Sequence, residues 1–456
     1  MVELYLNDVV EKALRKALLE GAEQAEVFTV KSRTLSLYIE DSKVKNLEEK
    51  FDVGISVRVA DGKKLGEASS TIASPEQVDV CTDSAIKAAR VSEPDAFFQG
   101  FGLGGEAVIS RPHVWDEEVA NLDTKKLSSK GVEIVDACIG VGDVKIPRGL
   151  IRTASIETEI GNSNGMSTTH RSTMVYLHFT SMTSSGVAGE GEESFFSTKL
   201  DMDTSAIGTS LAQGAMNSAR AVTFKGRSEV PVFIQAASLA EMFKTSVGFS
   251  IDSENVNRMR SAWVGKMGNE VASPSISIVD DPTDPRGILC TTHDDEGTPT
   301  CKRNIVEDGV LKSILFDGYN ASMAGVRSTG NGLRRTERDS QSLYQLPVHV
   351  SPINMVVQPG SKDRDELIST FDRAVLIERF AWPQVNPITG AIGLEVRCAH
   401  IMERGEIVET VKHALLTGNF YESLKKVVGI ANDQKVQGSW IVPTIGFDGM
   451  ELVGNP

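Results

Sequence analysis

The sequence is poor in the residues that usually mark a disulfide framework, a local metal site or a membrane span. Its five cysteines are an odd number, are scattered, and are never spaced as Cys-x-x-Cys, which indicates reduced thiols. No two of its seven histidines lie four or five residues apart, so no single helix presents a pair of imidazoles on one face. A disulfide scaffold, a zinc ribbon and a locally encoded two-histidine metal site are therefore not expected.

Basic residues and long apolar runs are also scarce. The chain has 47 Lys and Arg against 62 Asp and Glu, a net charge of −15, which argues against direct binding to nucleic acid or to an anionic membrane. No stretch reaches the roughly 18 apolar residues that a spanning helix needs. The N-terminal segment carries acids early and has no apolar core of the kind found in signal peptides. We expect a cytoplasmic protein without a membrane span.

The residue pattern predicts an α+β fold. With 456 residues the chain is long enough for two or three domains. Helical spacing over residues 9–18 and again over 74–91 encloses two stretches of period-two alternation, 33–41 and 52–70. A helix, an antiparallel meander and a second helix in this order are typical of an α+β domain.

Further along, the pattern divides the chain near residue 225. We expect an N-terminal α+β domain over residues 1–225, itself divisible into 1–110 and 111–225, and a C-terminal domain over 226–456. The second domain is predicted to be a curved, barrel-like body of strands with flanking helices. Within the first domain we predict helices at 122–140 and 201–220 and two long strands joined at Asn162 to Gly165; within the second, helices at 238–249, 317–325, 362–370 and 418–428, with hairpin turns at Asp308-Gly309 and Arg404-Gly405.

The most polar stretch is CTTHDDEGTPTC, residues 290–301. It holds two cysteines, one histidine and three carboxylates, which suggests a metal or acid-base site. However, consecutive side chains of an extended segment alternate in direction, so at most two of residues 293–296 could reach one ion. The spacing also fails the calcium-loop pattern. We therefore predict a polar turn at Asp295-Glu296-Gly297 that leads into a strand.

Taken together, several segments resemble the TldD/PmbA family, also called TldD/TldE or "modulator of DNA gyrase" proteins. They occur in the family's order and span nearly the whole chain. The segments are GISVRVADGKKLGEASS (54–70), GNSNGMS (161–167), HDDEGTPTCKRNIVEDGVLKSILFDGYNASMAGVRSTGNG (293–332), SPINMVVQPG (351–360) and NPITGAIGLEVRCAHIMERGEIVETVKHALLTGNFYESLKKV (386–427).

The resemblance implies a zinc peptidase family with two kinds of subunit. In the TldD kind, a helix carries His-Glu-x-x-x-His, and its histidines bind zinc together with a cysteine near the C-terminus. The corresponding helix here is 238–248, where Glu241 matches the glutamate but Ala240 and Thr245 stand at the histidine positions. No cysteine follows Cys398. By this resemblance the chain is of the TldE/PmbA kind, with no catalytic residue, metal ligand or cofactor of its own.

The same resemblance implies partners. We expect a zinc-bearing TldD-like subunit, with zinc held by that partner, and unfolded peptides as substrates of the pair. Asp294, Asp295, Glu296 and Gly297 would form a shared structural or cleft-lining loop. Two alternatives stay open: a stand-alone homodimer that binds peptides without cleaving them, and an autonomous hydrolase that uses the acidic loop at Asp294 to Glu296.

Overall fold

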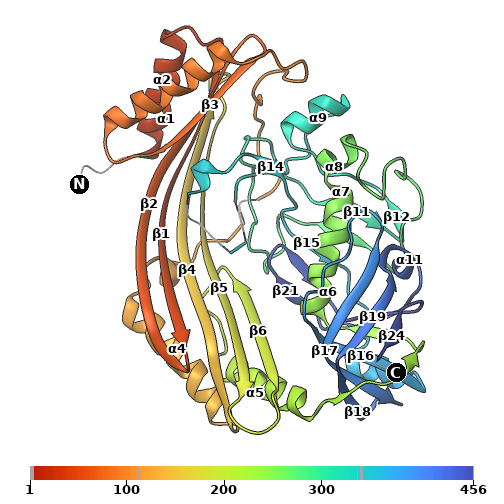
Figure 1. Ribbon diagram of the computed structural model, residues 1–456. Helices are drawn as coiled ribbons and strands as arrows, with labels where there is room; N and C mark the ends of the chain where they lie inside the picture. The colour runs from red at the N-terminus through yellow and green to blue at the C-terminus, as the bar shows by residue number, and fades with distance from the viewer. Residues whose placement is uncertain (1–4, 111, 336, 339–341, 455–456) are drawn as a thin grey trace.

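A long curved sheet packs against a strand-rich C-terminal half in the computed structural model, which describes residues 5–110, 112–335, 337–338 and 342–454. Figure 1 shows the sheet as a tall layer, with helices at both ends of its outer face and the C-terminal half against its other face. The predicted α+β class is confirmed. None of the helices in the described ranges combines the length and the apolarity that crossing a bilayer requires.

The N-terminal sheet is antiparallel, with strand order β3-β2-β1-β4-β5-β6. Its strands are β1 (Gln24–Glu40), β2 (Lys43–Asp61), β3 (Lys64–Thr71), β4 (Val144–Asn162), β5 (Ser167–Thr183) and β6 (Glu190–Ser197). The predicted meander and the predicted pair of long strands are confirmed, and β4 and β5 are joined through Asn162 to Gly165 as expected. The observed strands are longer than the predicted ones because both faces of the sheet are covered over much of their length.

Helices cover one face of this sheet, and every second side chain of β1 points toward them. Ala25 and Val27 pack under α1 and α2, whereas Leu35 and Leu37, on the same face, pack under α4. The four long helices are α1 (Leu6–Leu19), α2 (Pro75–Val91), α4 (Thr124–Ile139) and α5 (Thr204–Arg220), and α3 (Glu117–Ala120) is a single turn. The first helix begins at Leu6, and Asp8 lies in its first turn.

The intervening residues of β1 face the C-terminal half. Phe28 and Val30 pack against Leu343 and Tyr344 of a short 3-10 helix, η2 (Leu343–Gln345). Gly54 on β2 makes room for the Tyr344 ring, because a Cβ atom there would lie 1.9 Å from a ring carbon. The junction between the two halves is therefore a packed layer.

The C-terminal half is built from two mixed sheets and does not form the barrel-like body that we expected. Over the described residues the larger sheet runs β20-β23-β9-β16-β17-β19-β24-β8, with β18 also paired to β17 and β7 paired to β18, and its ends do not close on each other. Its strands are β7 (Val222–Thr223), β8 (Arg227–Ser228), β9 (Val232–Ile234), β16 (Arg373–Phe380), β17 (Ala391–Glu403), β18 (Glu406–Lys412), β19 (Ala414–Asn419), β20 (Val427–Ile430), β23 (Ile445–Phe447) and β24 (Glu451–Val453).

The second C-terminal sheet has the order β12-β11-β10-β15-β22-β21, and a β13-β14 pair lies apart. These strands are β10 (Ile278–Asp280), β11 (Arg303–Glu307), β12 (Val310–Leu311), β13 (Gly332–Leu333), β14 (His349–Val350), β15 (Met355–Val357), β21 (Lys435–Gln437) and β22 (Trp440–Val442). Both predicted hairpin turns are present, since Asp308-Gly309 and Arg404-Gly405 have positive φ at each position.

Short helices join these strands, and all of them overlap the predicted helices except the one at 253–257, which the sequence analysis did not predict. They are α6 (Ala236–Phe243), α7 (Phe249–Ile251), α8 (Ser253–Asn257), α9 (Gly318–Ala324), α10 (Arg364–Ser369) and α11 (Phe420–Leu424). The division of the chain near residue 225 stays a prediction; β7, just before it, already pairs with β18 of the C-terminal sheet.

Packing at the junction can be tested at Gly54. We expect Gly54→Ala to lower the free energy of unfolding by about 1–3 kcal/mol, because the added methyl group overlaps the buried Tyr344 ring. The matched control is Gly393→Ala, where a Cβ atom has no neighbour within 4 Å. Denaturant unfolding of both variants measures the difference, and an equal stability of the two would contradict the assigned packing.

Candidate functional site

The helix that would carry the zinc motif is present, but its side chains do not form a metal site. Ala240 is buried and carries no ligand atom. The Thr245 hydroxyl donates to the Glu241 carbonyl at 2.9 Å and accepts from the Val385 amide at 3.2 Å. The Glu241 carboxylate is half-buried and contacts no hydrogen-bond or ion-pair partner among the described residues.

The predicted helix over 238–249 is interrupted by a π-helical turn, η1 (Lys244–Gly248), between α6 and α7. The hydroxyls of Thr245 and Ser246 bond back to carbonyls of the preceding turn, at 2.9 and 2.5 Å. Such bonds compete with the backbone ladder and favour a widened turn. The segment keeps its place because Phe243 stacks near Trp440 of β22, with ring centroids 5.7 Å apart.

A lysine and a glutamate lie between this helix and the C-terminal tail. Lys244, the first residue of the π turn, donates to Glu337 at 2.8 Å. The other carboxylate oxygen of Glu337 accepts from the Ser439 amide at 2.9 Å and from its hydroxyl. Ser439 belongs to the tail segment that would supply the cysteine ligand, and Gly438 leaves space for Glu337, since a Cβ atom there would lie 2.3 Å from the carboxylate.

The charge at this position also disfavours a cation. Burial alone raises the pKa of Glu337, but the Lys244 ammonium and the Ser439 donors outweigh burial, so its pKa lies below the usual range. The Glu337 carboxylate is therefore ionised and already neutralised by Lys244. A methyl group, a committed hydroxyl and an ammonium ion cannot replace two imidazoles and a thiolate, so the residues present do not fit zinc.

The acidic loop forms the predicted turn, but its carboxylates are almost completely buried. Asp294, Asp295 and Glu296 are 2%, 3% and 8% exposed. One oxygen of Asp294 accepts from the amides of Glu296 and Thr298 at 3.0 and 2.8 Å, and the other accepts from the Gly332 amide at 2.9 Å. Asp294 therefore closes the turn and ties it to the loop at Gly332.

Asp295 and Glu296 each meet an arginine. Asp295 forms an ion pair with Arg335 at 3.0 Å, and both side chains are almost fully buried. Glu296 accepts from the Gly318 amide at 2.6 Å and lies 3.4 Å from the Arg58 guanidinium, on β2 of the N-terminal sheet. The acidic loop thus belongs to the junction between the two halves.

Arg58 also lies beside two glutamates of its own sheet. Glu26 on β1 and Glu67 on β3 stand directly opposite Arg58 in the strand registers, and Arg58 Nε donates to Glu26 at 2.9 Å. Arg334, which is fully buried, contacts Glu67 at 3.4 Å. Burial raises the pKa of the Glu26 carboxyl even beside Arg58.

The turn itself carries a raised proton affinity. Burial raises the pKa of Asp294 well above its usual range, and the neighbouring Glu296 carboxylate raises it further. Gly297 completes the turn at φ 77°, and a Cβ atom there would lie 2.4 Å from the Met166 sulfur. The conformation of the loop is therefore fixed by the hydrogen bonds, ion pairs and packing contacts of residues 294–297. Its role in lining a cleft stays a prediction.

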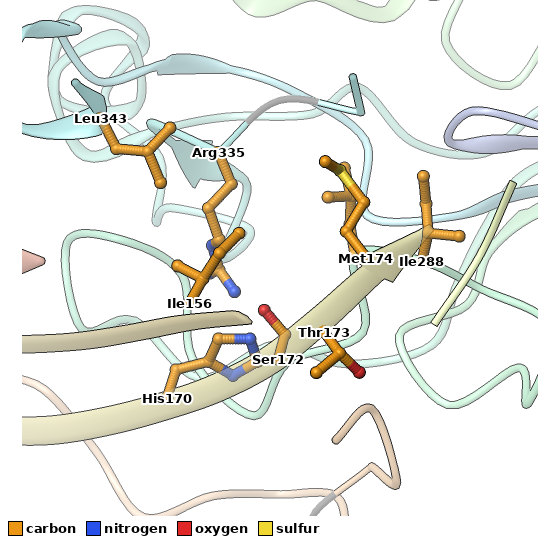
Figure 2. Close-up of a pocket in the computed structure, with 9 residues that line it drawn as sticks. Ile156, His170, Ser172, Thr173, Met174, Ile288, Arg335 and Leu343 are labelled. Carbon is orange, nitrogen blue, oxygen red and sulfur yellow. The ribbon is translucent and has the colours of Figure 1, made fainter. Parts of the chain in front are cut away.

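Two hollows lie beside the loop. Figure 2 shows the smaller one, where the Arg335 guanidinium points toward Ile156 and Ser172, with His170 beside them. One guanidinium nitrogen of Arg335 has no partner within the described part of the chain. A volume of about 20 Å³ suits one water molecule that could satisfy this nitrogen.

The larger hollow is a groove of about 550 Å³ between the loop at residues 103–109, the start of β5 and His293. His293 Nε2 lies 2.9 Å from the Gly105 carbonyl. The groove therefore receives His293, whereas the three carboxylates point into the junction instead. Cys301 contacts Arg303 at 3.3 Å and takes no part in the buried charge cluster.

Several residues of the site were not predicted from the sequence. Lys244 lies within the degenerate motif, next to the second histidine position, and could have been noticed as a cation there. Glu337, Arg58 and Arg335 carry no local signal, because their partners are distant in the chain.

Comparisons with known proteins identify the family and the fold. A family profile described as "PmbA/TldA metallopeptidase C-terminal domain" matches residues 227–454, and one described as "PmbA/TldA metallopeptidase domain 1" matches residues 25–89. An uncharacterized protein of Methanocaldococcus jannaschii is 26% identical over 445 residues, which cover 96% of this chain and 99% of that protein.

A "Metalloprotease TldD homolog" of Haemophilus influenzae is 24% identical over 433 residues, which cover 90% of this chain and 86% of that protein. The crystal structure of TldE from Thermococcus kodakarensis superposes with a TM-score of 0.89 at 23% identity, over 98% of this chain and 100% of that chain. At this identity the superposition demonstrates a shared fold.

The buried pair of the acidic loop yields one prediction. Asp295→Ala is expected to lower the free energy of unfolding by about 3–5 kcal/mol, because it leaves Arg335 buried without its counter-charge. His293→Ala and Cys301→Ala serve as controls and should each cost about 1 kcal/mol or less, since neither side chain belongs to the buried charge cluster. Urea unfolding measures all three, and a control as damaging as Asp295→Ala would contradict this assignment.

The Lys244–Glu337 pair yields a pH-dependent prediction. The folded-state pKa of Glu337 lies below its ordinary value of 4.5, so the pair's stabilisation is complete above that pH and is lost as the pH falls through the folded-state pKa. Lys244→Met should cost about 1–3 kcal/mol at neutral pH and progressively less in acid.

Unfolding free energies measured across this pH range test the prediction. Lys362→Met, which removes an exposed lysine 4.0 Å from Glu366, is the matched control and should change stability little at any pH. A Lys244→Met cost that stays constant down to strongly acidic pH would show that the ion pair does not form.

Proposed function

This chain belongs to the PmbA/TldD metallopeptidase family, and we propose that it serves there as a non-catalytic, TldE-like subunit. In this proposal it pairs with a separate, zinc-bearing TldD-like chain, and the pair cleaves unfolded peptides. The observation that carries the proposal is the site at α6, where Ala240, Thr245 and the Lys244–Glu337 pair stand where metal ligands would be needed.

An exposed apolar surface beside this site supports pairing. The loop before β17 presents Trp382, which is 76% exposed, and Ile388, which is 55% exposed. The same loop contacts the degenerate site, because the Val385 amide donates to Thr245. Exposed tryptophans of this kind often anchor protein interfaces, and a partner docked here would lie against the place where zinc is missing.

The groove beside β5 supports a role in handling extended peptides. β6 pairs with β5 only from Val175 to Met182, and the groove lies along Ser167 to Thr169, at the earlier part of the strand. A strand edge with groove space beside it can accept the backbone of an unfolded segment whatever its sequence. This arrangement suits a subunit that positions substrate without cleaving it.

Co-expression with the TldD-like protein of the same source tests the proposal. We expect the two chains to co-purify, and the pair to cleave an unstructured peptide in a reaction that a chelator abolishes. This chain alone should be inactive. Trp382→Glu should weaken pairing at least tenfold, whereas Phe51→Glu, a comparably exposed aromatic on β2, should not.

Three results would contradict the proposal. The first is a failure of the two chains to associate while this chain forms a stable homodimer, which would favour a stand-alone peptide-binding protein. The second is peptide cleavage by this chain alone. The third is equal activity of the TldD-like chain with and without this subunit.

A further inference from the structure

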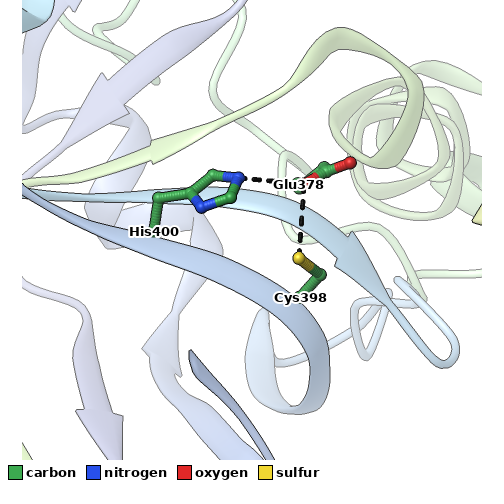
Figure 3. Close-up of side chains that lie close together, drawn as sticks. All are labelled: Glu378, Cys398 and His400. Carbon is green, nitrogen blue, oxygen red and sulfur yellow. Dashed lines mark hydrogen bonds and ion pairs between the residues drawn. The ribbon is translucent and has the colours of Figure 1, made fainter. Parts of the chain in front are cut away.

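Three metal-ligating side chains converge in the C-terminal sheet, away from the degenerate site. They are Glu378 on β16 and Cys398 and His400 on β17, and their ligand atoms all lie within 4.8 Å of one another. Figure 3 shows Glu378 between the other two, with His400 Nε2 at 2.9 Å and Cys398 Sγ at 3.2 Å from the same carboxylate oxygen.

A break in the strand register causes this convergence. Cys398 and His400 are two residues apart on β17 and therefore point to the same face of the sheet. In the pairing with β16, Ile377 lies opposite Ala399 and Arg379 opposite Cys398, so Glu378 is an extra residue at a β-bulge. A bulge re-aims the side chain that it carries, and here it places the carboxylate between the thiol and the imidazole.

α5 covers one side of the cluster, and the Glu378 side chain is 25% exposed. Cys398 and His400 are 2% and 6% exposed, and α5 passes over the carboxylate at Gly214, whose absent Cβ would lie 3.9 Å from the second Glu378 oxygen. The nearby cations have partners elsewhere: Arg379 donates to the Glu190 carbonyl at 3.0 Å, and Lys412 to the Ser218 carbonyl at 3.1 Å. Neither one neutralises the carboxylate directly.

We propose that Glu378, Cys398 and His400 bind a zinc-type divalent cation that fastens the β16–β17 bulge beneath α5. A carboxylate, a thiolate and an imidazole are the ligand types that zinc prefers, and three protein ligands leave one coordination position for water. The proposal goes beyond the peptidase role, because the ion would be structural and would lie in a chain without a catalytic zinc.

Charge and proton balance fit this exchange. Without metal, one carboxylate oxygen accepts from the Cys398 S–H and the His400 Nε2–H. On binding, the thiol proton would leave to solvent, and Nε2 would coordinate the ion with the imidazole proton on Nδ1. A thiolate, a carboxylate and a divalent cation then sum to zero charge, which favours burial.

The surroundings would hold the ligands in place. His400 Nδ1 lies 3.0 Å from the Thr410 hydroxyl on β18, an outer partner that would accept a hydrogen bond from Nδ1–H and aim Nε2 at the ion. Zinc bonds of about 2.0–2.3 Å at tetrahedral angles separate ligand atoms by roughly 3.3–3.7 Å. The two separations from the Glu378 oxygen, 2.9 and 3.2 Å, would lengthen by a few tenths of an ångström, and the thiol and imidazole atoms already lie within 4.8 Å of each other.

Metal titration of the full chain, stripped with a chelator, tests the proposal. We expect one equivalent of Zn²⁺ to bind and raise the Tm, and Co²⁺ to give the near-ultraviolet band of thiolate-to-cobalt charge transfer. Cys398→Ser should abolish that band and, with His400→Gln, weaken Zn²⁺ binding about 100-fold or more. Thr410→Val should weaken Zn²⁺ binding about 10-fold while keeping the band.

Cys301→Ser is the matched control, since that thiol lies outside the cluster, and it should bind both metals like the wild type. Circular dichroism of each metal-free variant shows whether it folds, and Glu378→Gln replaces Cys398→Ser as the decisive variant if the latter does not. The proposal is overturned if the wild type binds neither ion with micromolar affinity, or if the charge-transfer band survives Cys398→Ser. Neither result bears on pairing or peptidase activity.

Discussion

The Arg58 guanidinium is the point at which the two halves of the molecule are tied together. It donates to Glu26 within the N-terminal sheet and lies 3.4 Å from Glu296, which the C-terminal half delivers through its acidic turn. Each of these charged groups would be costly to bury without a counter-charge. Removing one of them therefore leaves the others buried with an uncompensated charge. The position of the turn relative to the curved sheet therefore depends on this contact and on the neighbouring Asp295–Arg335 pair.

The consequences extend from the junction to the degenerate zinc position. The segment that supplies Arg334 and Arg335 to the junction continues to Glu337, which reaches Lys244 and Ser439. One loop thus serves both places: Arg334 contacts Glu67 of the sheet, Arg335 pairs with Asp295 of the acidic turn, and Glu337 accepts from Lys244 beside α6.

Local features of the fold could be read from the sequence, whereas long-range contacts could not. Period-two alternation predicts β1 and β2, helical spacing predicts α2, and Asp308-Gly309 predicts a hairpin turn because both residues tolerate positive φ. The open C-terminal sheets were expected to be barrel-like, since strand patterns do not reveal whether a sheet closes. Arg58 and Glu296 are 238 residues apart, and no spacing rule brings them together.

The site was predictable to the same extent. Family resemblance places Ala240, Glu241 and Thr245 on one helix, because the motif is local; in the structure Ala240 and Glu241 lie on α6 and Thr245 lies on the π-helical turn that follows it. The same local signal gave no sign that Lys244 would meet Glu337. The Glu378, Cys398 and His400 cluster was missed for a further reason: a β-bulge, which is a backbone irregularity, brings Glu378 to its neighbours.

The central claim is that this chain holds no zinc at its motif helix and that its partner does. Anomalous scattering at the zinc edge, from crystals of the co-purified pair, tests it most directly. The account predicts a zinc peak at the His-Glu-x-x-x-His helix of the TldD-like chain and none between α6 and Ser439 of this one. A peak within bonding distance of Glu241 or Glu337 would contradict it.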